Sequence, residues 1–113
     1  MIAQVRPSEL SAWLQAARAD GTPVLLDVRE AAELRLASVK SDGFLLQTIP
    51  MSQLVARLDE LDPQQAVACL CHHGGRSMQV AAFLQSRGFS RIANVAGGIN
   101  AWSGELDPSI PRY

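Results

Sequence analysis

Blocks of apolar residues alternate with amphipathic segments along the chain, and the alternation predicts strands and helices in turn. Short, nearly unbroken apolar runs are typical of strands that are covered on both faces of a parallel sheet. The predicted strands cover residues 3–5, 23–28, 43–49, 65–70 and 92–95. Apolar residues that recur every three or four positions predict helices, which end near glycine or proline. The predicted helices cover the segment from Pro7 to a stop at Asp20-Gly21, and residues 30–36, 52–61, 76–87 and 99–102.

This alternation predicts an α/β fold with a central parallel sheet of about five strands and helices on both faces. The length of 113 residues is enough for one domain, so we expect a single domain over residues 1–113. In such a sheet, ligands bind at the carboxyl ends of the strands. The segment Asp27-Val28-Arg29 and Cys71 both follow predicted strands, so we expect them to share one rim of the sheet.

Composition and charge argue against several classes of partner. The formal net charge is −1 and the chain has no basic run, which argues against binding to nucleic acid or to an anionic membrane. No apolar stretch approaches the ~18 residues of a membrane span, and the N-terminus has no apolar signal-peptide core. The two cysteines are spaced i, i+2 in a predicted strand, where their side chains run parallel, so no disulfide is expected. A reducing, cytoplasmic location is therefore expected.

The segment 69–77 (Cys-Leu-Cys-His-His-Gly-Gly-Arg-Ser) carries the strongest chemical signal. It connects a predicted buried strand to a predicted helix, and unpaired N–H groups at a helix N-terminus lower the pKa of a nearby thiol. Cys71, at the mouth of this loop, is the expected nucleophile, whereas Cys69 lies within the strand and is expected to be core. Gly74 and Gly75 allow the backbone to curl so that several N–H groups point toward one anion. The competing interpretation of Cys71 is a buried, inert structural cysteine.

The other polar residues of this region each admit more than one interpretation. His72 and His73 either act as a base for the cysteine or shape the mouth of the pocket, and at least one of them is expected to face solvent. Zinc binding is disfavoured, because four ligands within five residues cannot easily surround one tetrahedral ion. Arg76 supports the loop or meets an anionic substrate, unless it is only a surface arginine. Asp27 and Arg29 either form a surface ion pair of little energetic value or hold backbone groups in place.

Three segments together form a family pattern. They are Asp27-Val28-Arg29-Glu30, Cys71-x-x-Gly74-x-Arg76-Ser77 and Asn94-Val95-x-Gly97-Gly98-Ile99-x-Ala101-Trp102. Through these segments the chain resembles a single-domain rhodanese-like sulfurtransferase, and the resemblance covers nearly its whole length. It implies a five-stranded parallel sheet and a cysteine that accepts a sulfane sulfur as a persulfide and passes it to a thiophilic acceptor. We expect residues 72–77 to form the substrate-binding loop around Cys71, with Asp27 and Arg29 in support.

The expected function is that of a sulfurtransferase of the thiosulfate:cyanide class. The Cys71 thiolate attacks the outer sulfur of a small donor, either thiosulfate or a persulfide, and the loop N–H groups stabilise the persulfide anion. Cyanide or a thiol, including a thiol on a protein, then takes the sulfur in a ping-pong cycle. Neither a metal nor an organic cofactor is expected.

Two alternatives stay open. The first is a phosphatase or arsenate reductase with a related cysteine loop. It is disfavoured because the loop from Cys71 to Arg76 is one residue shorter than the Cys-x5-Arg loop of similar phosphatases. The second is a non-catalytic binding module, which the presence of Cys71 disfavours.

Overall fold

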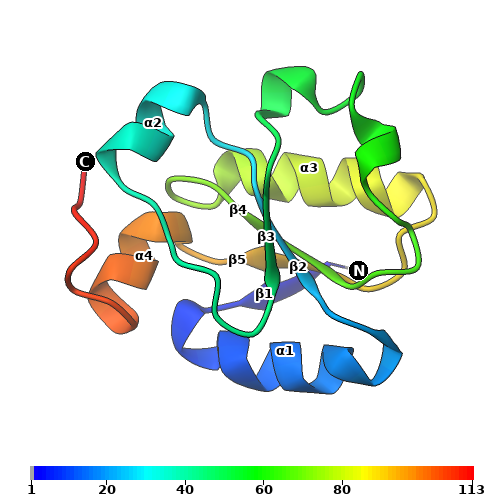
Figure 1. Cartoon of the computed structure of the whole chain (residues 1–113), viewed down its shortest axis with the longest axis horizontal. Coiled ribbons are helices and arrows are strands. Elements are labelled where there is room, and N and C mark those ends of the chain that lie inside the picture. Colours follow the sequence, from blue (N-terminus) through cyan, green and yellow to red (C-terminus); the bar gives the residue numbers. More distant parts are fainter. Residues whose placement is uncertain (1) are drawn as a thin grey trace.

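Five strands form one sheet in the order β1-β5-β4-β2-β3, and every neighbouring pair is parallel. The computed structural model describes residues 2–113 (Figure 1). The strands are β1 (Ala3–Val5), β2 (Val24–Asp27), β3 (Leu45–Thr48), β4 (Val67–Leu70) and β5 (Ile92–Val95). Each lies within a segment that the apolar pattern predicts as a strand, so the predicted parallel sheet of an α/β fold is confirmed. Met1, the first residue of the expected domain, lies outside the described residues.

The burial of each strand follows its place in the sheet. Every residue of the inner strands β2, β4 and β5 is buried, as expected for strands that are covered on both faces. The edge strands β1 and β3 are mostly exposed, and β3 leaves Leu45 and Leu46 accessible to solvent. The apolar run that predicts β3 therefore marks an edge strand with one neighbour.

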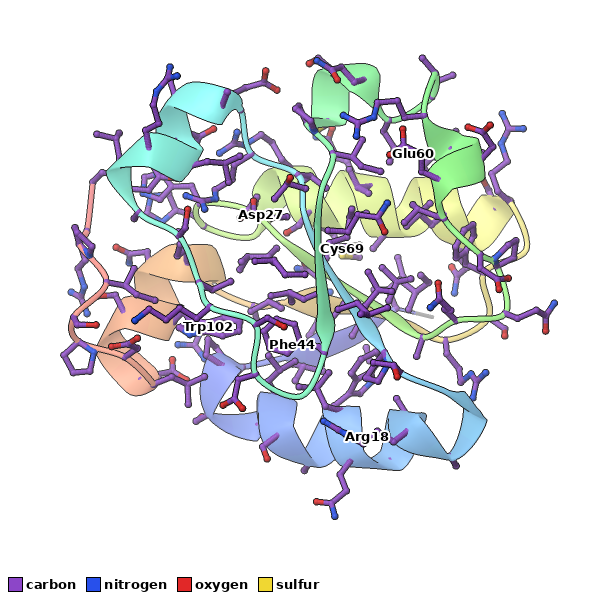
Figure 2. The ribbon with its side chains drawn as sticks, in the orientation of Figure 1. Arg18, Asp27, Phe44, Glu60, Cys69 and Trp102 are labelled. Carbon is purple, nitrogen blue, oxygen red and sulfur yellow. The ribbon has the colours of Figure 1, made fainter. Side chains whose placement is uncertain are left out.

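Helices cover both faces of the sheet, as the alternation predicts (Figure 1). They are α1 (Leu10–Ala17), α2 (Ala31–Leu36), α3 (Gly75–Ser86) and α4 (Gly98–Glu105). On one face, α3 packs through Val80, Ala81 and Leu84. On the other, α1 and α4 share a core in which Phe44 and Trp102 meet edge to face, with ring centroids 6.3 Å apart (Figure 2). No helix within residues 2–113 is long and apolar enough to cross a membrane.

The segment 52–61 is not the continuous α-helix that its apolar spacing predicts. It contains parts of two separate 3-10 turns, Met51–Gln53 and Leu58–Glu60. Its backbone hydrogen bonds mostly join residues three apart in sequence, as they do in 3-10 structure. Leu54 and Leu61 are buried, but Val55 is 73% exposed, so the segment has no continuous apolar side. Leu54 and Leu61 attach this segment to the core. A short helix without a continuous apolar side is not stable by itself, so the segment does not form one.

Leu54→Ala should lower the free energy of unfolding by about 2–5 kcal/mol, because a buried side chain is lost and a cavity remains. The neighbouring change Val55→Ala should alter it by less than ~0.5 kcal/mol, since the valine side chain already lies in water. Urea unfolding of both variants measures the difference. Equal losses would show that Val55 belongs to a buried helix side after all.

Candidate active site

The carboxyl ends of β2 and β4 bring the two predicted site segments to one rim of the sheet. These strands are parallel neighbours with Asp27 opposite Leu70, and the Val28 N–H donates to Leu70 O at 2.9 Å. Asp27 is the last residue of β2, and Cys71 is the first residue after β4. Figure 2 shows Asp27 and Cys69 on these two strands. The predicted shared rim is therefore confirmed.

The Cys71 sulfur lies in a small cradle of hydrogen-bond donors. The Gly74 N–H donates to Cys71 Sγ at 3.0 Å, and the Ser77 hydroxyl oxygen lies 3.2 Å from the same atom. Cys71 is only 1% exposed, so the prediction that it lies at the mouth of the loop is wrong: its side chain lies beneath the loop. The reason is the alternation of a strand, which places Cys71 on the same side as Cys69, facing the core that α3 covers.

The two cysteines differ sharply in acidity. Burial raises the pKa of Cys69 to about 12, with a further contribution from the charge of Cys71. Burial alone would also raise the pKa of Cys71. Hydrogen bonds from the Ser77 hydroxyl and from the N–H groups of Ser77, Gly74 and His73 outweigh it, and the pKa of Cys71 falls below that of an ordinary thiol. Cys71 is therefore the more acidic of the two thiols, and its pKa is shifted in the direction that the sequence predicts; neither cysteine is in a disulfide.

The two loop glycines do not play the same part. Gly74 caps α3 in a left-handed conformation with φ +108°, and an added Cβ would lie 3.3 Å from Gly97 N. Gly75 is the first residue of α3, has no positive φ, and would leave an added Cβ with nothing within 4 Å. The expectation that both glycines are needed for the backbone curl is therefore wrong for Gly75, because the change of direction is completed at Gly74.

The first turn of α4 holds the backbone of the cysteine loop. The Ile99 N–H donates to Cys71 O at 2.9 Å, and the Asn100 N–H donates to His72 O at 3.1 Å. Gly98 permits this approach: its φ is +60°, and a Cβ there would overlap the carbonyl groups of Cys71 and His72. Because the His72 carbonyl bonds to α4, the His73 N–H on the opposite side of the same peptide group faces the sulfur.

Asn94 of β5 supports the cradle by contacting both Ser77 and Gly74. It is buried, its Oδ1 lies 2.5 Å from the Ser77 hydroxyl, and its Nδ2 donates to Gly74 O at 3.3 Å and to Gln4 Oε1 at 3.0 Å. A hydroxyl has one proton, so Ser77 donates either to Asn94 or to the Cys71 sulfur at a given moment. Asn94 therefore fixes the Ser77 side chain within reach of Sγ. It belongs to the family pattern, but no local feature of the sequence assigns it this role.

Asp27 and Arg29 form a fully buried ion pair, so the alternative of a surface pair is wrong. Arg29 Nη2 lies 2.8 Å from Asp27 Oδ2, and Arg29 Nε lies 2.9 Å from Oδ1. The pair also holds backbone, as predicted, because the Arg29 N–H donates to Asp27 Oδ1 and Arg29 Nη1 donates to Glu33 O. Burial favours the uncharged guanidine, but hydrogen bonds to Asp27 and Tyr113 outweigh it and raise the pKa of Arg29.

Glu33 of α2 is a site residue that the sequence does not reveal. It binds Arg76 through two bonds, Nη1 to Oε1 at 2.6 Å and Nη2 to Oε2 at 2.8 Å, and its Oε2 accepts a bond from the Tyr113 hydroxyl at 2.7 Å. The Arg76 guanidinium is the largest cause that lowers the pKa of Glu33 to about 2. Locally, Glu33 is visible only as a capping residue of α2, where it accepts a bond from the Glu30 N–H. Arg76 thus supports the loop by joining α3 to α2.

Tyr113, the only tyrosine of the chain, brings the C-terminal segment onto the site. The segment after α4 has no helix or strand, but the Tyr113 ring stacks on His72 with centroids 3.8 Å apart and 8° between the planes. Its hydroxyl accepts a bond from Arg29 Nη1 at 3.1 Å. Figure 1 shows this segment running past α4 toward α2. No pattern in the sequence signals this contact.

The two histidines have different surroundings. His73 is exposed, as expected for at least one of them, whereas His72 is half-buried. Burial lowers the pKa of His72, and the charge of His73 lowers it further. His72 Nε2 has no hydrogen-bond partner within the described chain, so it makes no bond to the Cys71 sulfur. Within residues 2–113, no three His, Cys, Asp or Glu side chains are grouped as they would be around a metal ion.

Comparison with known proteins identifies the family. The sequence profile of the rhodanese-like domain matches residues 10–105. The chain belongs to the rhodanese-like family. It is 44% identical over 93 residues to the rhodanese-like/PpiC domain-containing protein 12, chloroplastic, of Arabidopsis thaliana, a match that covers 79% of this chain and 30% of that protein. It is 31% identical over 107 residues to the putative sulfurtransferase YtwF of Bacillus subtilis, covering 93% of this chain and 97% of that protein.

Solved structures of rhodanese-like proteins share the fold. The crystal structure of a rhodanese-related protein from Thermoplasma volcanium superimposes with a TM-score of 0.75 at 29% identity, covering 98% of this chain and 99% of that chain. Several curated rhodanese-like relatives are longer, and this chain spans from 20% to 51% of their length. The Bacillus subtilis relative, which matches over nearly its whole length, carries the name putative sulfurtransferase, and this connects the family to sulfur transfer in general.

Gly74→Ala should disturb the rhodanese-like loop, whereas Gly75→Ala should not. A side chain at position 74 must adopt φ +108°, which costs about 1–3 kcal/mol of stability and displaces the N–H that faces Sγ. Alanine at position 75 should keep or slightly raise stability, since it favours a helix over glycine. Urea unfolding and the pH dependence of Cys71 alkylation measure both effects. The assignment is wrong if the two variants lose stability and thiol acidity equally.

Ser77→Ala should raise the pKa of the Cys71 thiol, because the thiolate loses its hydroxyl donor while its burial is unchanged. The rate of alkylation against pH, measured in a Cys69→Ser background, should show a midpoint below the ~8.5 of a free thiol before the change and a higher one after it. Ser86→Ala is the matched control, since this serine lies at the far end of α3 and bonds to Phe83 O. A midpoint that moves equally in both variants would contradict the role of Ser77.

Proposed function

We propose that this protein is a sulfurtransferase in which Cys71 carries the transferred sulfur as a persulfide. The observation that supports it most is the donor cradle, in which the Gly74 N–H and the Ser77 hydroxyl face a sulfur whose pKa is lowered despite burial. The same donors can stabilise the negative charge of a persulfide, by the logic of an oxyanion hole. Membership of the rhodanese-like family supports the same reaction.

The reaction has two halves. The Cys71 thiolate attacks the outer sulfur of a donor, a new S–S bond forms, and the old bond to that sulfur breaks with its electron pair. The leaving group is sulfite when the donor is thiosulfate, or a thiolate when the donor is a persulfide. An acceptor, cyanide or a thiolate on a small molecule or a protein, then attacks the outer sulfur and releases the Cys71 thiolate.

The remaining site residues position the loop. Arg76 joins α3 to α2 through Glu33, and the Asp27–Arg29 pair fixes the neighbouring strand end. Protein atoms alone can perform every step, so the proposal includes no metal or organic cofactor. A reducing compartment such as the cytoplasm would keep Cys71 reduced and so able to react with the donor.

The structure gives a phosphatase less support. Both terminal nitrogens of Arg76 are bound to Glu33, so its guanidinium is not available to a phosphate without breaking that pair. Asp27 is buried against Arg29 and cannot deliver a proton to a leaving group. These contacts favour sulfur transfer over hydrolysis of phosphate esters.

Incubation with a persulfide or with thiosulfate should add one sulfur atom to the protein, as measured by intact mass, and cyanide should remove it. Cys71→Ser should abolish the gain, whereas Cys69→Ser should retain most of it because that thiol is buried and protonated. Both variants should unfold cooperatively in urea, which separates chemistry from misfolding. A folded Cys71→Ser protein that still gains sulfur, or a wild type that gains none from either donor, would overturn the proposal.

A small aryl phosphate serves as the comparison substrate. Turnover of this ester that depends on Cys71, without any gain of sulfur, would establish the phosphatase alternative. The absence of both activities would point to a binding module.

A further inference from the structure

Arg76, the arginine of the cysteine loop, is already paired with a carboxylate. Arg76 directly precedes Ser77, whose hydroxyl contacts Cys71 Sγ, and its charge interacts with that of Cys71. Its two terminal nitrogens bind the two oxygens of Glu33 at 2.6 Å and 2.8 Å, the fork geometry in which charge-assisted hydrogen bonds are strongest. The positive charge of Arg76, which could attract a negatively charged donor, is therefore neutralised by Glu33.

Glu33 is held so that it cannot easily release Arg76. Besides the guanidinium, it accepts bonds from the Tyr113 hydroxyl at 2.7 Å and from the Glu30 N–H at 3.1 Å. Its side chain is 18% exposed, compared with 35% for Arg76. A dianion that binds Arg76 must first displace this carboxylate and break two charge-assisted bonds.

The second arginine beside the loop is balanced in the same way. Arg29 is completely buried and bonds to both oxygens of Asp27. Its remaining terminal nitrogen, Nη1, donates to Glu33 O and to the Tyr113 hydroxyl. Neither arginine presents an unbalanced charge to the sulfur, and the groups that donate to Sγ are neutral backbone N–H groups and one neutral hydroxyl.

From this arrangement we infer that Glu33 sets the donor preference of the site, by neutralising Arg76 and so favouring persulfides over thiosulfate. The inference rests on the proposed sulfurtransferase function and names its donor class. At its reacting group, thiosulfate carries two negative charges and leaves as a sulfite dianion, whereas a persulfide R–S–S⁻ carries one and leaves as a thiolate R–S⁻; the carboxylates of glutathione persulfide lie on R, several bonds from the reacting sulfurs. In both cases Cys71–S⁻ becomes Cys71–S–S⁻, so only the charge of the donor and of its leaving group differs. A cradle of neutral donors accommodates the smaller charge better.

The test removes the charge of Glu33 and keeps its shape. In Glu33→Gln, the amide oxygen can still accept from Tyr113 or Glu30, but Arg76 is left with an unbalanced positive charge. The ratio of kcat/KM for thiosulfate to kcat/KM for glutathione persulfide, with cyanide as the acceptor, should rise about tenfold, mainly through a lower KM for thiosulfate. Measuring both donors on one preparation cancels any loss of folded protein.

Two further variants separate the charge effect from a structural one. Glu60→Gln is the matched control, because Glu60 also binds an arginine, Arg57, through two bonds but away from the loop. Its donor ratio should equal that of the wild type. The double variant Glu33→Gln/Arg76→Gln removes the cation as well, and the ratio should return toward the wild-type value.

The outcomes are distinguishable. A wild type that uses thiosulfate as efficiently as glutathione persulfide contradicts the inference, as does a Glu33→Gln variant that turns over persulfide with an unchanged or lower ratio. If the donor ratio rises in Glu33→Gln and stays equally high in the double variant, the inference is also contradicted, because the charge of Arg76 would not be the cause. If the wild type takes sulfur from neither donor, the result contradicts the proposed sulfurtransferase function itself.

Discussion

Two backbone hydrogen bonds hold the reactive loop in the shape on which its chemistry depends. They run from the first turn of α4, at Ile99 and Asn100, to the carbonyl oxygens of Cys71 and His72. A trans peptide group points its carbonyl and its N–H in opposite directions, so the His72 carbonyl that bonds to α4 leaves the His73 N–H facing the sulfur. Gly98 is the residue that makes room, since a Cβ at this position would occupy the space of those carbonyl groups. The family pattern around Gly97 and Gly98 thus acts on a loop more than twenty residues away.

Buried charge supplies the second constraint. Asp27 and Arg29 are removed from water together, and such a pair is maintained only if both partners are present, because one charge left alone costs about 3–5 kcal/mol. Through Glu33 and Tyr113, Arg29 also connects β2 with α2 and the C-terminal segment. Arg76 closes the same network from the side of α3. The cysteine loop is therefore held by α4, by α2 through the Arg76–Glu33 pair, and by Tyr113 of the C-terminal segment. None of these groups takes part in the proposed bond-making.

Features that are local in the chain could be predicted from the sequence, and features that join distant segments could not. The apolar runs found every strand, and the order of strand, loop and helix distinguished Cys71 from Cys69. Glu33 and Arg76 are 43 residues apart, and Glu33 and Tyr113 are 80 apart, so no periodicity relates them. The helix predicted over residues 52–61 is wrong for another reason. Its apolar spacing fits a helix, but the spacing does not show whether other residues pack against the apolar side, and Val55 is exposed to solvent.

The strand order has a consequence for the nascent chain. β5 lies between β1 and β4, and within residues 2–113 β1 pairs with β5 alone. Synthesis proceeds from the N-terminus, so β1 cannot join the sheet until residues 92–95 have been made, and contacts of this range form late. Ile99 and Asn100 emerge after β5, so the cysteine loop is also unsupported until then. The acidity of the Cys71 thiol thus depends on backbone contacts that cannot form until β5 and the first turn of α4 have been synthesised.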